Sequence, residues 1–275
     1  MKEKHPKIRE RIEHNEFSGF AKKRLLITAE HALTKTIRVD DGRIFIGDRN
    51  TGILARITAF GTSSAYAIPR FNRYYADASR NPSLLGKGVP YRAKVKVLKG
   101  GKIRWETKII NTHISVKYAG SLAEYHRTIE ALNPRAILSI HGKSSPSAKK
   151  KFHMLLGAGP DYEYMGGKRN AFRFRRRFRE KIKEVLSKMQ LDERGPLLGE
   201  DINSGLSRRL SGRRNFILKK FVAQHNESGR KRIGLQVELD DTGRKLGPNK
   251  NVAYEYQIAL QVIADMLAQP GAAGE

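Results

Sequence analysis

Three short apolar runs, each followed closely by a charged or imidazole side chain, stand out along this chain. They are residues 25–29 (Leu-Leu-Ile-Thr-Ala), 136–140 (Ala-Ile-Leu-Ser-Ile) and 233–237 (Ile-Gly-Leu-Gln-Val). Runs of this length without internal charge are typical of strands that are buried on both faces of a sheet. The sequence therefore predicts an α/β fold with a mixed, largely parallel central sheet flanked by helices.

Other segments carry apolar residues at the spacing of a helix. The predicted helices cover residues 49–60, 118–132, 172–189, 215–225 and 251–269. Alternating apolar residues on either side of Gly100-Gly101 predict a β-hairpin over 92–97 and 103–109. We interpret this hairpin as an excursion from the main sheet, spanning residues 91–110, that covers or shapes a pocket.

The remaining segments are predicted to lack regular structure. Residues 65–82 are interpreted as a loop that grips an anion, residues 161–167 as irregular, and residues 195–214 as a long loop with a possible lid function. The predicted organisation is a basic N-terminal arm (1–20), a single α/β domain (21–269) with a basic insertion (166–232), and a flexible tail (270–275).

The composition limits the function classes. The chain has 54 Lys+Arg against 27 Asp+Glu, a balance that favours anionic substrates or partners and argues against cationic substrates. Cysteine is absent, which excludes disulfides, thiolate metal sites and cysteine nucleophiles, so any metal must be bound by His, Asp or Glu. No segment has the apolar length of a transmembrane span or the pattern of a signal peptide, and we expect a cytoplasmic protein.

The candidate chemistry lies at the ends of the three predicted strands. Glu30-His31 follows the first, His141 follows the second, and Glu238 ends the third. The carboxyl ends of parallel strands share one edge of the sheet, where ligands bind in α/β proteins. The alternatives are structural: Glu30-His31 as the first turn of a helix and His141 as a hydrogen-bonded structural residue. His126, on the predicted helix over residues 118–132, could also face this crevice, and its alternative is a place on the helix flank.

Arginines and an aspartate occur close together in residues 72–82, Asn-Arg-Tyr-Tyr-Ala-Asp-Ala-Ser-Arg-Asn-Pro. The guanidinium groups of Arg73 and Arg80 could hold a planar anion while Asp77 orients one of them. An ordinary surface network of Arg and Asp is the alternative.

Taken in order, these segments resemble the N-formylglutamate amidohydrolases, relatives of the zinc carboxypeptidase and aspartoacylase fold. The resemblance rests on Ala29-Glu30-His31-Ala32, on Arg73, Asp77 and Arg80 at the family's spacing, on Ser139-Ile140-His141-Gly142, and on Gln236-Val237-Glu238-Leu239. It covers about residues 25 to 245. A hydrolase fold of the zinc carboxypeptidase type is what it implies.

The resemblance also implies roles for individual residues. Zn²⁺ would be held by His31, His141 and one carboxylate, for which Glu30 is preferred. Because Thr34 stands where carboxypeptidases have a ligand Glu, this remaining ligand is open, and Asp77 or His126 are the alternatives. Glu238 would act as general base, Arg73 and Arg80 would hold the substrate carboxylate or the oxyanion, and Asp77 would orient an arginine at the substrate site. Ser145 is a further candidate for substrate binding, because it lies in the polar loop after His141, which could contact a bound anion through backbone N–H groups. The implied reaction is hydrolysis of a small anionic N-acyl amino acid.

A second hypothesis comes from a different class. The predicted helix over residues 172–189 has an apolar stripe and an otherwise strongly basic surface. Such a helix could bind nucleic acid or another anionic surface on a hydrolase fold that has lost activity. Salt-dependent binding that is insensitive to chelators would distinguish this function from metal-dependent catalysis.

Overall fold

The structure is a computed structural model of the whole chain. It describes residues 12–17, 24–32, 36–39, 42–45, 48, 50–142, 154–191, 214–224, 231–240, 244 and 250–269. The predicted lid (195–214, apart from Arg214), the C-terminal tail, Ser145 and residues 1–11 of the predicted arm lie outside the described residues.

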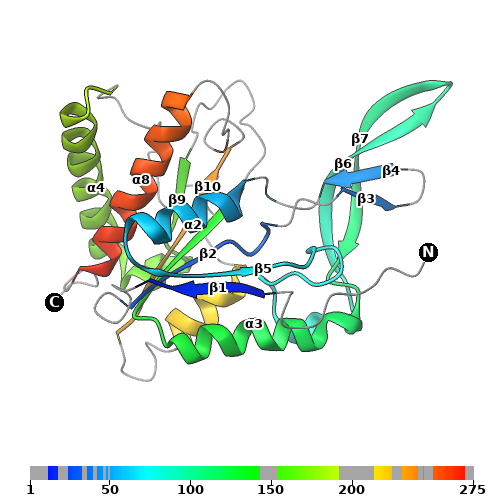
Figure 1. Ribbon diagram of the computed structural model, residues 1–275. Helices are drawn as coiled ribbons and strands as arrows, with labels where there is room; N and C mark the ends of the chain where they lie inside the picture. The colour runs from blue at the N-terminus through cyan, green and yellow to red at the C-terminus, as the bar shows by residue number, and fades with distance from the viewer. Residues whose placement is uncertain are drawn as a thin grey trace.

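A six-stranded sheet forms the centre of the molecule (Figure 1), in the order β1-β5-β2-β8-β10-β9. Its strands are β1 (Ile12–Glu16), β2 (Leu25–Thr28), β5 (Ala65–Pro69), β8 (Ala136–Gly142), β9 (Met154–Gly157) and β10 (Ile233–Leu239). The four inner strands are parallel, whereas β1 and β9 pair antiparallel at the two edges. The predicted α/β fold class is confirmed, and the three apolar runs become β2, β8 and β10.

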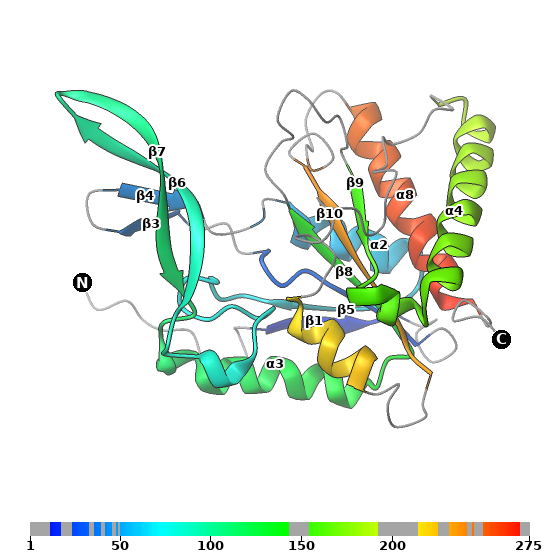
Figure 2. The same ribbon diagram turned by 180° about the vertical axis from the view of Figure 1, so that it is seen from behind.

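Helices cover both faces of this sheet. They are α2 (Thr51–Gly61), α3 (Ala119–Leu132), α4 (Lys168–Lys188), α6 (Phe216–Leu218), the π-helical turn η5 (Lys219–Ala223) and α8 (Lys250–Ala268), with short 3₁₀ turns η2 (Pro82–Leu84), η3 (Val116–Tyr118) and η4 (Pro160–Met165). Figure 2 shows α3 and the α6–η5 segment on the face opposite α4 and α8. Each predicted helix is present, with boundaries shifted by a few residues.

Side-chain alternation divides the core into two layers. Leu25, Ile27 and Leu138 point toward the layer that contains α2, α4 and α8. Leu26 and Ile137 point toward the layer that contains α3, α6 and η5. Because neighbours in register share a face, polar residues at positions 28, 139 and 236 form one row across three parallel strands on the α3 side.

Two predictions about the sheet are corrected. Residues 65–69, interpreted as part of a loop, form the inner strand β5, whose alanines gave little strand signal. Residues 12–16, interpreted as part of a polar arm, form the edge strand β1, which pairs with β5. An edge strand with one solvated face needs few apolar residues, so its sequence resembles a polar arm.

The predicted hairpin is present and longer than predicted. It consists of β6 (Val89–Lys99) and β7 (Lys102–Thr112), and it joins β3 (Thr36–Val39) and β4 (Gly42–Phe45) in a separate four-stranded antiparallel sheet. The hairpin extends well beyond the central sheet in both ribbon views (Figures 1 and 2).

The basic helix α4 packs on the core through Phe174, Phe178, Ile182 and Leu186, and contacts α8. Most of its arginines and lysines are exposed. Binding of nucleic acid by this exposed face stays a prediction. Among the described residues, no helix combines the length and apolar composition needed to cross a bilayer.

Gly234 in β10 provides a test of how α6 and η5 pack against the central sheet. A Cβ atom there would lie 2.8 Å from Leu218 Cδ2 and 2.9 Å from Val222 Cγ2. We expect Gly234→Val to lower the free energy of unfolding by about 1–3 kcal/mol through overpacking, although valine is the better strand former. Urea denaturation measures the change, and a variant as stable as the parent would show that η5 does not pack against β10 as described.

Candidate metal centre

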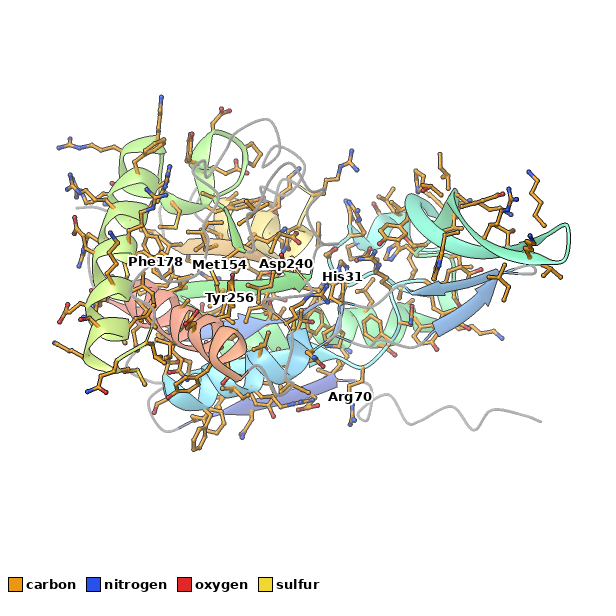
Figure 3. The ribbon with its side chains drawn as sticks, turned by 90° about the horizontal axis from the view of Figure 1, so that it is seen from above. His31, Arg70, Met154, Phe178, Asp240 and Tyr256 are labelled. Carbon is orange, nitrogen blue, oxygen red and sulfur yellow. The ribbon has the colours of Figure 1, made fainter. Side chains whose placement is uncertain are left out.

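The strand order places two histidines at a topological switch point. From β2 the chain passes through α2 to β5 on one side, and then through α3 to β8 on the other side of β2. A crevice opens where such connections diverge at the carboxyl ends of the strands. His31 follows β2 and His141 lies near the end of β8, so both imidazoles lie at this point. Figure 3 shows His31 on the side of the sheet that faces the hairpin.

The two imidazoles face each other through their Nδ1 atoms, which are 3.3 Å apart. The Oδ2 atom of Asp48 lies 3.3 Å from His31 Nδ1 and 3.6 Å from His141 Nδ1. All three side chains are buried. This group of His31, Asp48 and His141 could therefore hold a metal ion.

The spacing of these three atoms suits a small tetrahedral cation. Ligands bound at the usual zinc distances of about 2.0–2.2 Å lie about 3.4 Å from one another. Two imidazole nitrogens and one carboxylate oxygen are also a donor set that zinc commonly takes in catalytic sites. The residues present fit the ion that the family resemblance implies.

Each histidine is held on its far side by a carboxylate. His31 Nε2 lies 2.8 Å from Asp77 Oδ1, and His141 Nε2 lies 3.1 Å from Glu30 Oε2. A carboxylate at Nε2 favours the tautomer with the proton on Nε2, which leaves the Nδ1 lone pair for a metal. Both rings are oriented in this way toward the same point.

Further hydrogen bonds fix the two supporting carboxylates. Thr28 and Ser139 donate from their hydroxyl groups to Glu30, at 2.8 and 2.9 Å. Ser79 donates to Asp77 from its backbone N–H and its hydroxyl, at 3.0 and 2.7 Å. These donors stabilise the ionised acids, as buried carboxylates require.

The electrostatics follow from this arrangement. Burial disfavours the charged forms, but the attraction of His141 lowers the pKa of Glu30, and hydrogen bonds from His141 and His31 keep the pKa of Asp48 well below its usual range. Burial likewise opposes protonation of His141. The carboxylates of Glu30 and Asp48 outweigh this effect and raise the pKa of His141 well above its usual value. His31, His141, Asp48, Glu30 and Asp77 thus form an anionic cage that is suited to a cation.

Arg73 lies beside this cage. Its Nη1 donates to His31 Nδ1 at 3.1 Å and is 3.9 Å from Asp48 Oδ1, while its guanidinium lies 4.0 Å from the ring centroid of Tyr91 in the hairpin. A metal at His31 Nδ1 would break that hydrogen bond, because the nitrogen has one lone pair. The guanidinium would then be available to an anionic ligand.

Arg80 lies nearby and is partly exposed, with its Nε 3.6 Å from Asp77 Oδ2. Among the described residues, the buried Nε atoms of Arg73 and Arg80 have no hydrogen-bond partner. Two guanidinium groups with donors to spare next to the cage could bind a carboxylate.

Glu238 lies on the same face of the sheet, opposite His141 in the β8–β10 register. Burial raises its pKa to about 7, against the attraction of His141. A carboxyl group with a pKa near neutrality is suited to accept and return a proton.

A chain of amides links Glu238 to the histidine cage. Gln236 donates from Nε2 to Glu238 Oε1 at 2.6 Å and accepts from Asn215 Nδ2 at 3.0 Å. Asn215 Nδ2 also donates to Ser139 Oγ at 2.8 Å. Asn215 is fixed in turn because its Oδ1 accepts from the backbone N–H groups of Ile217 and Leu218, at the start of α6.

The structure thus brings together His31, His141, Glu30, Asp77, Arg73, Arg80 and Glu238 from the predicted set. Glu30 contacts the outer nitrogen of His141, and Asp48 takes the place beside the two Nδ1 atoms that the sequence interpretation gave to Glu30. His126, the other alternative ligand, packs against the rings of Phe216 and Phe221, at 5.4 and 6.2 Å between ring centroids.

Sequence reasoning missed Asp48 and Asn215. Asp48 precedes α2, and its carbonyl oxygen accepts from the Thr51 hydroxyl, so in sequence it resembles an ordinary helix-start residue. Asn215 precedes α6 in the same way. Only the fold shows that both side chains reach the strand ends.

The fold is similar to that of a solved structure. A crystal structure of N-formylglutamate amidohydrolase from Ralstonia eutropha JMP134 superposes with a TM-score of 0.53 at 14% sequence identity, covering 93% of this chain and 97% of that one. The chain has the fold of an N-formylglutamate amidohydrolase. This is the fold that the sequence resemblance implied.

A gene product from Agrobacterium tumefaciens also aligns, with a TM-score of 0.48, 11% identity, and coverage of 93% of this chain and 95% of that one. No protein-family model and no curated protein sequence matches the chain.

The packing of His126 generates a prediction about acid stability. Burial, together with the charge of Lys220, lowers its pKa from the ordinary value of 6.5 to about 4. Between these values the unfolded chain binds a proton at this site and the folded chain does not, so unfolding becomes easier as pH falls. We expect His126→Phe to remove up to about 3 kcal/mol of the loss in unfolding free energy between pH 6.5 and 4.

Chemical denaturation of parent and variant across this pH range measures the difference. Above pH 7 the two curves should run parallel, because His126 is neutral in both states of the parent. Parallel curves over the whole range would contradict the assigned environment of His126.

Proposed function

We propose that this protein is a zinc-dependent amidohydrolase that cleaves a small anionic N-acyl amino acid, with N-formylglutamate as the reference substrate. The observation that carries the proposal is the pair of imidazoles held at Nε2 by Asp77 and Glu30, with both Nδ1 atoms directed at each other and at Asp48. Carboxylate-oriented histidines of this kind are typical of catalytic zinc sites.

The proposed ligands are His31 Nδ1, His141 Nδ1 and a carboxylate oxygen of Asp48. When bound, zinc supplies a Lewis acid that polarises a carbonyl group and lowers the pKa of a water molecule to about 7. Asp77 and Glu30 hold the two imidazoles in the required tautomer, and Thr28, Ser139 and Ser79 keep these two acids ionised.

Glu238 is the proposed general base. Its raised pKa lets it take a proton from the attacking water near neutral pH and return that proton to the leaving nitrogen of the amide. Gln236 restrains its carboxylate, and Asn215 restrains Gln236 in turn. The buried position excludes bulk water from this transfer.

Arg73 and Arg80 are proposed to bind the substrate carboxylate or the developing oxyanion. Their Nε atoms have no hydrogen-bond partner among the described residues, and an ion pair with Asp77 restricts the position of Arg80. The excess of basic residues in the chain adds a long-range attraction for an anionic substrate.

Metal content tests the ligand set. We expect purified protein dialysed against zinc to retain one equivalent per chain, and Asp48→Asn to abolish stoichiometric retention because it removes the anionic ligand. Glu30→Gln, a matched change in a buried acid that meets His141 at its outer nitrogen Nε2, should weaken zinc affinity by about 10–100-fold. Zinc retained by Asp48→Asn and lost by Glu30→Gln would reverse the two assignments.

Activity tests the general base. With N-formylglutamate and other N-acyl amino acids as substrates, Glu238→Gln should lower kcat by about 10²–10⁴-fold while leaving zinc content unchanged. Glu184→Gln, an exposed carboxylate on α4, is the control and should match the parent. Full turnover in Glu238→Gln, or turnover of the parent that survives complete chelation, would overturn the mechanism.

A further inference from the structure

The β6–β7 hairpin is a long projection. Its strands pair without interruption from Val89↔Thr112 to Lys99↔Lys102. Gly100 and Gly101 have φ of 58° and 70°, the left-handed conformation that a two-residue hairpin turn requires. Figures 1 and 2 show the turn far from the central sheet, so the tip is free to meet a partner without obstructing the sheet.

Large apolar side chains are exposed along the hairpin, from the turn to positions near its base. Leu98 is 70% exposed, Ile103 68%, Ile109 66% and Trp105 54%. Along β7 three of these apolar positions (103, 105 and 109) alternate with exposed basic residues at 102, 104 and 108. Leu98 is directly opposite Ile103 in the strand register, next to the turn. Such a cluster is unusual on a free surface and marks an interaction site.

The charge of the hairpin limits the kind of partner. Residues 89–112 contain seven basic residues and a single acidic residue, Glu106. A second copy of this chain would bring an equally basic hairpin and would be repelled. The partner must therefore combine an anionic surface with a region that takes up aliphatic side chains.

We propose that the β6–β7 hairpin docks on the surface of an anionic lipid bilayer. Its basic residues would contact lipid phosphates, while Leu98, Ile103 and Trp105 would enter the boundary between head groups and acyl chains. Tryptophan favours this boundary. Nucleic acid fits less well, since bases stack on aromatic rings and aliphatic side chains gain little there. This docking does not depend on the proposed amidohydrolase activity.

Trp105 is the only tryptophan of the chain, so its fluorescence reports on the hairpin alone. We expect vesicles of phosphatidylglycerol and phosphatidylcholine to shift its emission to shorter wavelength, and acyl-chain-brominated lipids to quench it. Vesicles of phosphatidylcholine alone should bind the full-length protein at least about tenfold more weakly, because the electrostatic contribution is lost.

The double variant Leu98→Ser/Ile103→Ser changes exposed residues and keeps Trp105. It should lower vesicle affinity by about tenfold or more, because burial of two aliphatic side chains is lost. Val116→Ser, an equally exposed apolar residue outside the hairpin, is the matched control and should bind as the parent does.

Three results would overturn the proposal. The first is the absence of an emission shift with anionic vesicles. The second is a response of Trp105 to a single-stranded oligonucleotide without quenching by brominated lipid. The third is an emission shift that appears with rising protein concentration and without vesicles, which would identify a second copy as the partner.

Discussion

The site depends on one electrostatic constraint: two buried imidazoles are each tied at Nε2 to a buried carboxylate. Burying either acid or either base alone would be costly, and pairing them offsets much of that cost. The pairing also fixes how each ring is turned. Because Asp77 and Glu30 hold the outer nitrogens, the inner Nδ1 atoms converge with Asp48 on one point.

The parallel register of the central sheet makes this convergence possible. Thr28, Ser139 and Gln236 lie side by side in one row, and His141 and Glu238 are neighbours in the next. The row nearer the core supplies neutral hydrogen-bonding groups, and the row at the strand ends supplies the titratable ones. Asn215 hydrogen-bonds to Ser139 and Gln236 of the first row and to the backbone at the start of α6. Near the strand ends, the α3 face of the sheet therefore holds a polar network in place of apolar packing.

Much of the fold was accessible from the sequence because buried strands and amphipathic helices have distinct periods. The runs at 25–29, 136–140 and 233–237 are mostly apolar and carry no charged residue on either face, as is typical of inner parallel strands. Strand β5 escaped detection because Ala65 and Ala67 carry little strand preference and Pro69 is a turn signal. Edge strand β1 has a single buried residue, Ile12, and its sequence pattern cannot be told from a polar arm.

The candidate site could be predicted in part, because residues that end an apolar run can be located from the run itself. His31, His141 and Glu238 are such residues. Asp48 comes from the connection between β2 and α2. Its place in the site depends on how that segment folds back toward β8, where the Asp48 carboxylate accepts a hydrogen bond from the Gly142 N–H at 2.9 Å. No local pattern encodes such a return, and Glu30, adjacent to His31, was the more obvious carboxylate.

Diffraction data collected on either side of the zinc absorption edge, from crystals grown with zinc, would locate the ion among its proposed ligands. We expect one anomalous peak within bonding distance of His31 Nδ1, His141 Nδ1 and a carboxylate oxygen of Asp48. A peak bonded to Glu30 or to either Nε2 atom, or no peak between the two imidazoles in zinc-saturated crystals, would contradict it.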